Sequence, residues 1–116
     1  MGEVVLFEPD MLFSSRIESV ATRFGLVVKV AVTVGELERA LRESVPKLLL
    51  VDLDALTNGG VSSLGSVYIG CRRVGYYSHA DSKLAAQALA CGFEMVMPRR
   101  AFKVQLNKIL ADLGSG

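Results

Sequence analysis

The stretch LLLVDLDAL, from Leu48 to Leu56, is the most informative part of this 116-residue chain. It places four apolar residues in a row before two aspartates, Asp52 and Asp54, that are one residue apart. A strand that is apolar throughout, without alternation, is typical of a parallel sheet covered on both faces. Its acidic end lies where open parallel α/β sheets bind their ligands, outside the carboxyl ends of the strands.

The bulk composition indicates one domain with its own core, and we expect a single domain over residues 1–116. Thirteen Lys and Arg against twelve Asp and Glu leave a formal net charge of +1, without the basic excess that nucleic-acid backbones require. The N-terminus has no basic region followed by an apolar core, and the longest uncharged stretch, Ala55 to Cys71, is interrupted by polar residues and glycine. We therefore expect a cytoplasmic protein that binds neither nucleic acid nor membranes.

Hydrophobic periodicity predicts strands that alternate with helices along the whole chain. The expected strands are Val4–Phe7, Leu26–Val32, the opening stretch, Arg73–Ser78 and Glu94–Pro98. The expected helices are Met11–Phe24, Val34–Ser44, a poorly determined segment within 61–71, Ser82–Cys91 and Ala101–Leu113. Their boundaries have capping residues at Asp10, Thr33 with Glu36, Asp81, Gly25 and Gly92. Five strands that alternate with five helices predict an α/β fold with a parallel sheet and right-handed crossovers.

The carboxyl ends of four strands carry polar side chains that such a sheet would bring to one edge. These are Glu8 and Asp10, Asp52 and Asp54, Ser78 and His79, and Arg99 and Arg100. Several carboxylates that face a hydroxyl and a guanidinium suit a hard divalent cation with a phosphoryl group beside it. Without such compensation the acids would repel one another, and their pKa values would rise.

These elements and spacings resemble a response-regulator receiver domain over almost the whole chain. The resemblance rests on LLLVDL ending in Asp52, on Gly60 eight residues later, on Ser78 after the fourth strand, and on the run AAQALACGFEMVMPRR. It implies a flavodoxin-like, doubly wound five-stranded parallel sheet in strand order 2-1-3-4-5, with helices on both faces. It also implies a non-enzymatic signal-transduction module of a two-component phosphorelay.

The resemblance further assigns roles at the predicted site. Asp52 falls at the position that accepts a phosphoryl group from a histidine kinase, Ser78 at the position that binds the phosphoryl oxygens, and Arg99 at the usual lysine after the fifth strand. A magnesium ion would be held by Glu8, Asp10, Asp52 and the backbone carbonyl of Asp54.

Several signature positions depart from the receiver pattern. Receivers usually have two adjacent acids after the first strand, whereas FEPD has Pro9, which cannot ligate a metal through its side chain, and Asp10 is also the expected helix cap. Arg99 keeps the charge of lysine but not its compact ammonium geometry. Leu56 replaces a proline and Val96 replaces an aromatic residue. We therefore expect a divergent domain or pseudo-receiver, in which Mg²⁺ binding is weak or absent.

Simpler interpretations compete with these roles. Asp52 is alternatively a polar strand end that caps the next turn, and the Asp54 side chain is expected to face solvent. The basic cluster of Arg99, Arg100 and Lys103 is either a solvated face or a clamp for anions near Asp52. His79 has no nucleophile partner in a recognisable motif and is expected to be solvated.

Two aromatic residues and two thiols are expected to be structural. Tyr76 and Tyr77 point to opposite faces of the fourth strand, so one of them is predicted to lie in the core. Cys71 and Cys91 have neither metal-ligand spacing nor a secretory context, and we interpret both as buried thiols.

The leading functional prediction is a stand-alone receiver-like module, phosphorylated on Asp52, that acts on a protein partner such as a histidine kinase or a downstream target. The expected contact surface, also a candidate homodimer interface, comprises Ser82–Cys91, Glu94–Pro98 and Ala101–Leu113. An alternative is a pseudo-receiver that binds protein without phosphorylation. A weaker alternative is a small ligand-binding protein or enzyme on the same fold, but FEPDMLF lacks the glycine that phosphate-binding first loops normally contain.

Overall fold

A five-stranded parallel sheet forms the centre of the molecule in the computed structural model, which describes residues 4–56, 71–78 and 82–114. The strands are β1 (Val4–Phe7), β2 (Val28–Ala31), β3 (Leu48–Asp52), β4 (Arg72–Tyr77) and β5 (Met95–Pro98). Their order in the sheet is β2-β1-β3-β4-β5, and every neighbouring pair is parallel. The predicted flavodoxin-like sheet is therefore confirmed.

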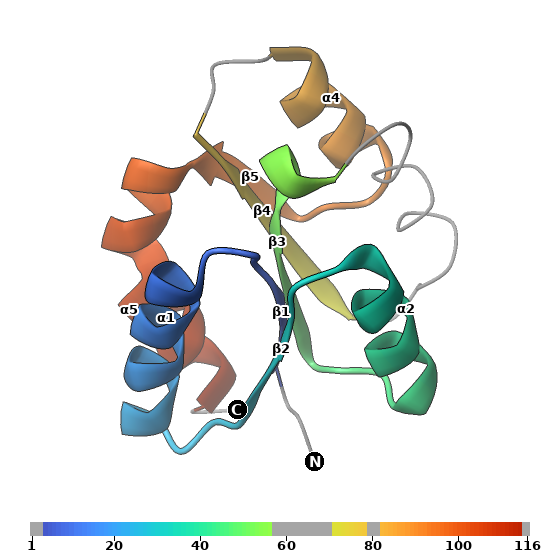
Figure 1. Ribbon diagram of the computed structural model, residues 1–116. Helices are drawn as coiled ribbons and strands as arrows, with labels where there is room; N and C mark the ends of the chain where they lie inside the picture. Colours follow the sequence, from blue (N-terminus) through green and yellow to red (C-terminus); the bar gives the residue numbers. More distant parts are fainter. Residues whose placement is uncertain (1–3, 57–70, 79–81, 115–116) are drawn as a thin grey trace.

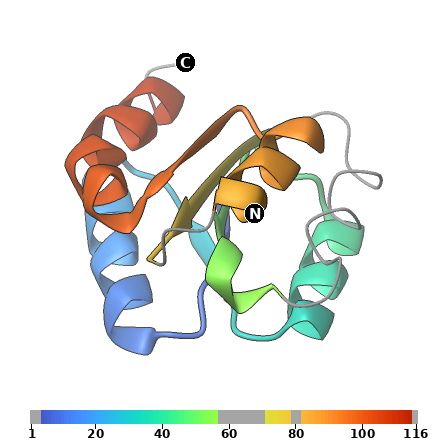
Figure 2. The same ribbon diagram turned by 90° about the horizontal axis from the view of Figure 1, so that it is seen from above.

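Helices cover both faces of the sheet, as the sequence predicts. The described helices are α1 (Met11–Arg23), α2 (Val34–Glu43), α4 (Ser82–Ala90) and α5 (Arg99–Gly114), and a short 3₁₀ turn, η1 (Leu53–Ala55), follows β3. Helices α1 and α5 lie side by side on one face, and α2 and α4 lie on the other (Figures 1 and 2). The expected helix within 61–71 lies almost entirely outside the described residues, as do Gly60, His79 and Asp81.

The predicted caps account for the helix boundaries. The Asp10 carboxylate accepts the Leu12 and Phe13 backbone N–H groups at the start of α1, and Thr33 accepts the Glu36 N–H at the start of α2. Gly25, with φ of 71°, follows the end of α1 in the left-handed conformation that glycine adopts without a steric penalty. The last helix begins at Arg99 and not at the expected Ala101, so Arg99 and Arg100 form its first turn.

The core consists of two apolar layers, one on each side of the sheet. Leu48 and Leu50 of β3 pack against α1 and α5, whereas Leu49 and Val51 pack against the other layer, and all four are 0% exposed. This double burial explains the continuous apolar run before Asp52, because successive residues of a strand point to opposite faces.

The register brings the predicted site residues to one edge of the sheet. Phe7 pairs with Val51, so Glu8 follows β1 at the level at which Asp52 ends β3. Asp52 in turn pairs with Tyr76 of β4. The carboxyl ends of the three central strands therefore carry Glu8, Asp52 and Tyr76 next to one another.

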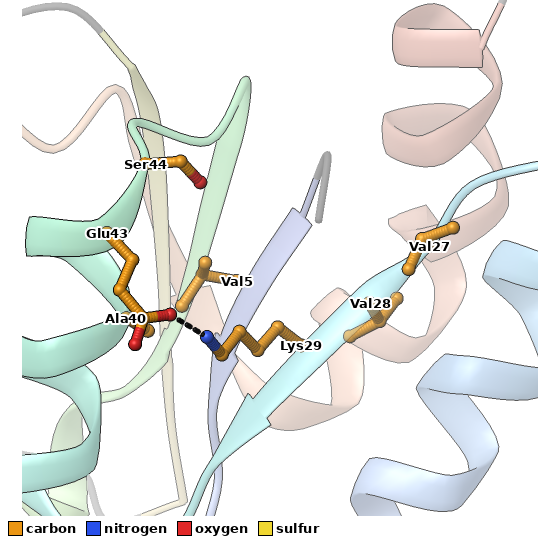
Figure 3. A pocket seen from close by; sticks show the side chains of 7 residues that line it. All are labelled: Val5, Val27, Val28, Lys29, Ala40, Glu43 and Ser44. Carbon is orange, nitrogen blue, oxygen red and sulfur yellow. Dashed lines mark hydrogen bonds and ion pairs between the residues drawn. The ribbon is translucent and has the colours of Figure 1, made fainter. Parts of the chain in front are cut away.

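A cavity of about 420 Å³ lies away from this edge, between the start of β2 and the end of α2 (Figure 3). Its lining is apolar except for Ser44 and an ion pair between the half-exposed Lys29 and Glu43. We assign no chemistry to this cavity, because it lacks a convergent set of polar groups. Among the described residues, no helix is long and apolar enough to cross a membrane.

Candidate functional site

Glu8 is the most buried acid of the site, with a side chain that is 1% exposed. Its Oε2 accepts the backbone N–H of Asp10 at 3.0 Å. Its Oε1 accepts the hydroxyl of Tyr76 at 2.7 Å and Nη2 of Arg99 at 3.1 Å. Three donors from three different elements therefore compensate for the burial of this carboxylate.

Asp52 ends β3 and is 6% exposed. Its Oδ1 accepts the backbone N–H of Asp54 at 3.1 Å, so it caps the turn η1, as the simpler interpretation of the sequence predicted. Its Oδ2 accepts Nη2 of Arg99 at 3.3 Å. Both carboxylate oxygens of the candidate phosphoacceptor thus already have donors within the chain.

Arg99 is the cation that joins these acids. A single nitrogen, Nη2, contacts both Glu8 and Asp52, and Nη1 lies 4.0 Å from Oδ2 of Asp10. The guanidinium carbon lies 4.4 Å from the ring centroid of Phe13 and 5.6 Å from that of Tyr76, so two aromatic rings hold the cation in place. We refer to Glu8, Asp52, Tyr76 and Arg99 as the acidic site.

The neighbouring Glu8 influences the ionisation of Asp52. Burial, followed by the negative charge of Glu8 and a hydrogen bond shared with it, raises the pKa of Asp52 to about 7, although Arg99 opposes this rise. Burial and the hydrogen bond to Glu8 also raise the pKa of the Tyr76 phenol above its ordinary value. Tyr76 therefore remains a protonated donor to Glu8, and Asp52 carries a proton for part of the time near neutral pH.

The remaining predicted residues lie at the rim. Asp10 is half exposed and its Oδ1 is occupied as the cap of α1. The Asp54 carboxylate was expected to face solvent, but it is partly buried and accepts the backbone N–H of Ser78 at 2.6 Å, which ties the end of β3 to the end of β4. Ser78 itself is exposed.

The acidic site does not fit a divalent metal ion. Among the described residues, no group of three or more His, Cys, Asp or Glu side chains is placed to hold one. The guanidinium of Arg99 lies against Glu8 and Asp52, the two carboxylates that a metal would need first. A fixed positive charge in this position repels a second cation and so disfavours a metal ion here. The Mg²⁺ ligand set of Glu8, Asp10, Asp52 and Asp54 stays a prediction.

Tyr76 and Phe13 are site residues that sequence reasoning did not identify. Tyr76 was expected only as a possible core residue, and it is indeed 0% exposed and stacked on Phe102. Its position opposite Asp52 in the register is the signal that could have assigned its hydroxyl to the site. Phe13 lies on the buried face of α1, and its contact with Arg99 depends on how α1 and α5 pack.

Comparisons with known proteins now bear on this geometry. The sequence matches no protein-family model, and no curated protein matches it. Solved structures do match: a signal receiver domain of a DNA-binding response regulator (merR) from Colwellia psychrerythraea 34H has a TM-score of 0.84 at 14% identity, with 100% of each chain covered. The chain has the fold of a response-regulator receiver domain.

Two further receiver structures show the same likeness at the level of the fold. The beryllofluoride-activated NtrC4 receiver domain dimer has a TM-score of 0.77 at 15% identity, covering 98% of this chain and 99% of that chain. A response regulator from Burkholderia pseudomallei, with a phosphorylated aspartic acid, a calcium ion and citrate, has a TM-score of 0.76 at 15% identity, covering 99% of this chain and 72% of that chain. The resemblance predicted from the sequence is thus confirmed for the receiver-domain fold.

Proposed function

We propose that this chain is a cytoplasmic, non-enzymatic signalling module of the receiver fold that acts through contact with another protein, without phosphorylation of Asp52. The observation that carries this proposal is the position of Arg99, whose Nη2 contacts Oε1 of Glu8 at 3.1 Å and Oδ2 of Asp52 at 3.3 Å. Arg99 then serves as a built-in cation where the receiver resemblance implies a metal ion.

Two features of the acidic site argue against phosphoryl transfer to Asp52. A carboxylate attacks phosphorus only when it is ionised, and the raised pKa of about 7 keeps a fraction of Asp52 protonated near neutral pH. Without a metal ion to neutralise the oxygens of the transferred group, little compensation remains for the charge that develops in the transition state. The Burkholderia pseudomallei regulator contains both a phosphorylated aspartic acid and a calcium ion, so the two features occur together in that protein.

A titration with Mg²⁺ and beryllofluoride, followed by amide chemical shifts, tests the proposal directly. We expect no saturable shift at Glu8, Asp52 or Ser78 in the wild type, and no mass increase after incubation with acetyl phosphate. A phosphoryl adduct that disappears in Asp52→Ala would contradict the proposal and support the phosphorylated alternative.

A variant that restores the receiver pattern supplies a positive control. Pro9→Asp adds an acid beside Glu8 and Asp10, and Arg99→Lys replaces the planar guanidinium by a compact ammonium. The double variant is expected to bind Mg²⁺ at least about tenfold more tightly than the wild type, because it gains one oxygen ligand and loses the bridging cation. Equal Mg²⁺ affinity in the two proteins would show that Arg99 and Pro9 are not what excludes the metal.

A further inference from the structure

A second, smaller cavity lies between the first turns of α1 and α5, beside the acidic site. It has a volume of about 160 Å³ and is lined by Asp10, Leu12, Phe13, Arg16, Arg99 and Lys103. Both helices begin at the carboxyl edge of the sheet and run side by side from there (Figure 1). We refer to this cavity as the cationic pocket.

Helical spacing explains why three basic side chains meet in this pocket. Arg99 and Lys103 are four residues apart on α5, and Leu12 and Arg16 are four residues apart on α1, so each pair shares one helix face. The first-turn N–H groups of α5 add partial positive charge at the same end.

The positive charge of the cationic pocket is poorly compensated. Among the described residues, no carboxylate forms an ion pair with Arg16 or Lys103, and the Nζ of Lys103 lies 5.7 Å from the ring centroid of Phe13. Arg99 directs Nη2 at the acidic site, but its Nε is buried without a hydrogen-bond partner in the described part of the chain. Glu8 and Asp52 already offset the charge of Arg99, so the uncompensated charge of the pocket is that of Arg16 and Lys103. The only acid among the lining residues is Asp10, whose Oδ1 already caps α1.

We propose that the cationic pocket binds a dianionic phosphoryl group through Arg16 and Lys103, with Arg99 shared between this pocket and the acidic site. A phosphoryl group presents several acceptor oxygens to donors that converge from two helices, which matches this arrangement better than a single carboxylate does. Met11 and Leu12, at 73% and 86% exposure, provide apolar surface beside the pocket for an organic phosphate monoester. The binding is noncovalent and needs neither Asp52 nor a metal ion.

The test is a titration with inorganic phosphate, and in parallel with phenyl phosphate, at about pH 8 without Mg²⁺ and at constant ionic strength. We expect saturable amide shifts at residues 12–16 and 99–103 and none with chloride or acetate. Tighter binding of phenyl phosphate assigns the site to an organic monoester, whereas equal affinity assigns it to free phosphate. Shifts that chloride reproduces at the same ionic strength would overturn the proposal.

Matched charge variants separate the cationic pocket from a general effect of positive charge. Arg16→Gln and Lys103→Gln are each expected to weaken phosphate binding by about tenfold, because each removes a charge-assisted hydrogen bond. Lys108→Gln removes the same charge from an exposed position of α5 outside the pocket, and it should change the affinity by less than about twofold. An equal loss in Lys108→Gln would overturn the proposal.

The same titration on Asp52→Asn keeps this inference distinct from the proposed function. Binding that persists in this variant supports the cationic pocket, even if Asp52 proves able to accept a phosphoryl group. Binding that disappears in Asp52→Asn would locate the phosphate at Asp52 and overturn the proposal.

Discussion

Asp52 lies beside a second buried acid, Glu8, and in the described part of the chain the guanidinium of Arg99 is the one cation paired with both. Its pKa is raised to about 7, whereas the same carboxyl in an unfolded chain titrates near 3.8. The folded protein therefore holds a proton between about pH 4 and pH 7 that the unfolded chain has released. Stability falls with rising pH wherever the folded state binds more protons than the unfolded state. The contribution of Asp52 to the free energy of unfolding therefore decreases as the pH rises through this window.

The variant Asp52→Asn should remove this pH dependence. Its amide can donate to Glu8 as the protonated carboxyl does, and it has no charge to lose. Relative to the wild type, we expect Asp52→Asn to gain about 2–3 kcal/mol in the free energy of unfolding at pH 8 compared with pH 5. Urea denaturation at a series of pH values measures this difference. Glu38→Gln removes the same charge from an exposed position, and it should leave the pH dependence unchanged.

Position 99 is arginine in this chain, whereas receivers usually have lysine there, and the two side chains differ in more than length. The planar guanidinium reaches two acids through Nη2 while it lies against the rings of Phe13 and Tyr76. A lysine ammonium at the same place would be a compact charge without this stacking. The contact of one guanidinium with two acids is thus the physical basis of the proposed function.

At the scale of single elements, β4 and the turn η1 approach each other closely at Gly75. A Cβ atom at this position would lie 2.9 Å from Cδ1 and 3.0 Å from Cγ of Leu53. Leu53 is 0% exposed and has little room to move, so the two elements would have to separate. This contact fixes the turn that Asp52 caps.

Gly75→Ala is therefore expected to lower the free energy of unfolding by about 1–3 kcal/mol, which thermal or urea denaturation can measure. Gly35→Ala in α2 is the matched control, because the nearest atom to its new Cβ is 4.0 Å away. This control should be neutral or should stabilise by up to about 1 kcal/mol, since alanine favours the helix over glycine. Similar losses in both variants would contradict the assigned role of the Leu53 contact.

Local signals explain which elements could be predicted from the sequence. The first residues of α1 and α2 are fixed by the capping side chains of Asp10 and Thr33, which accept N–H groups within three residues. Such short-range signals can be recognised in the sequence. The start of α5 at Arg99 was missed, because it follows Pro98 without a capping side chain of the usual type. Parallel register made it possible to predict that Glu8, Asp52 and Arg99 share one edge of the sheet.

Contacts between layers explain what the sequence did not reveal. The expectation that Arg99 would help to clamp an anion near Asp52 did not anticipate that it contacts both Glu8 and Asp52. That contact requires α5 to pack beside α1, which places Phe13 beneath the guanidinium. The hydroxyl of Tyr76 likewise reaches Glu8 across 68 residues of sequence, a distance at which periodicity carries no information.

At the scale of the whole molecule, the β5 edge of the sheet is flanked by two helices, one on each face, that carry exposed apolar side chains. Leu89 of α4 is 53% exposed and Val104 of α5 is 74% exposed, and the edge strand β5 lies between these helices (Figure 1). This is the surface at which the sequence predicted a homodimer.

We expect concentration-dependent dimerisation without Mg²⁺ or a phosphoryl mimic, because in the proposed function no phosphorylation switches the surface on. Sedimentation velocity over a range of protein concentrations measures the dissociation constant. Leu89→Glu and Val104→Glu should each raise that constant by about tenfold or more, since each buries an unpaired charge in the interface. Val45→Glu is the control, because Val45 is 63% exposed in the connection between α2 and β3, away from this surface. A monomer at every concentration, or an equal effect of Val45→Glu, would rule out α4, β5 and α5 as a homodimer interface.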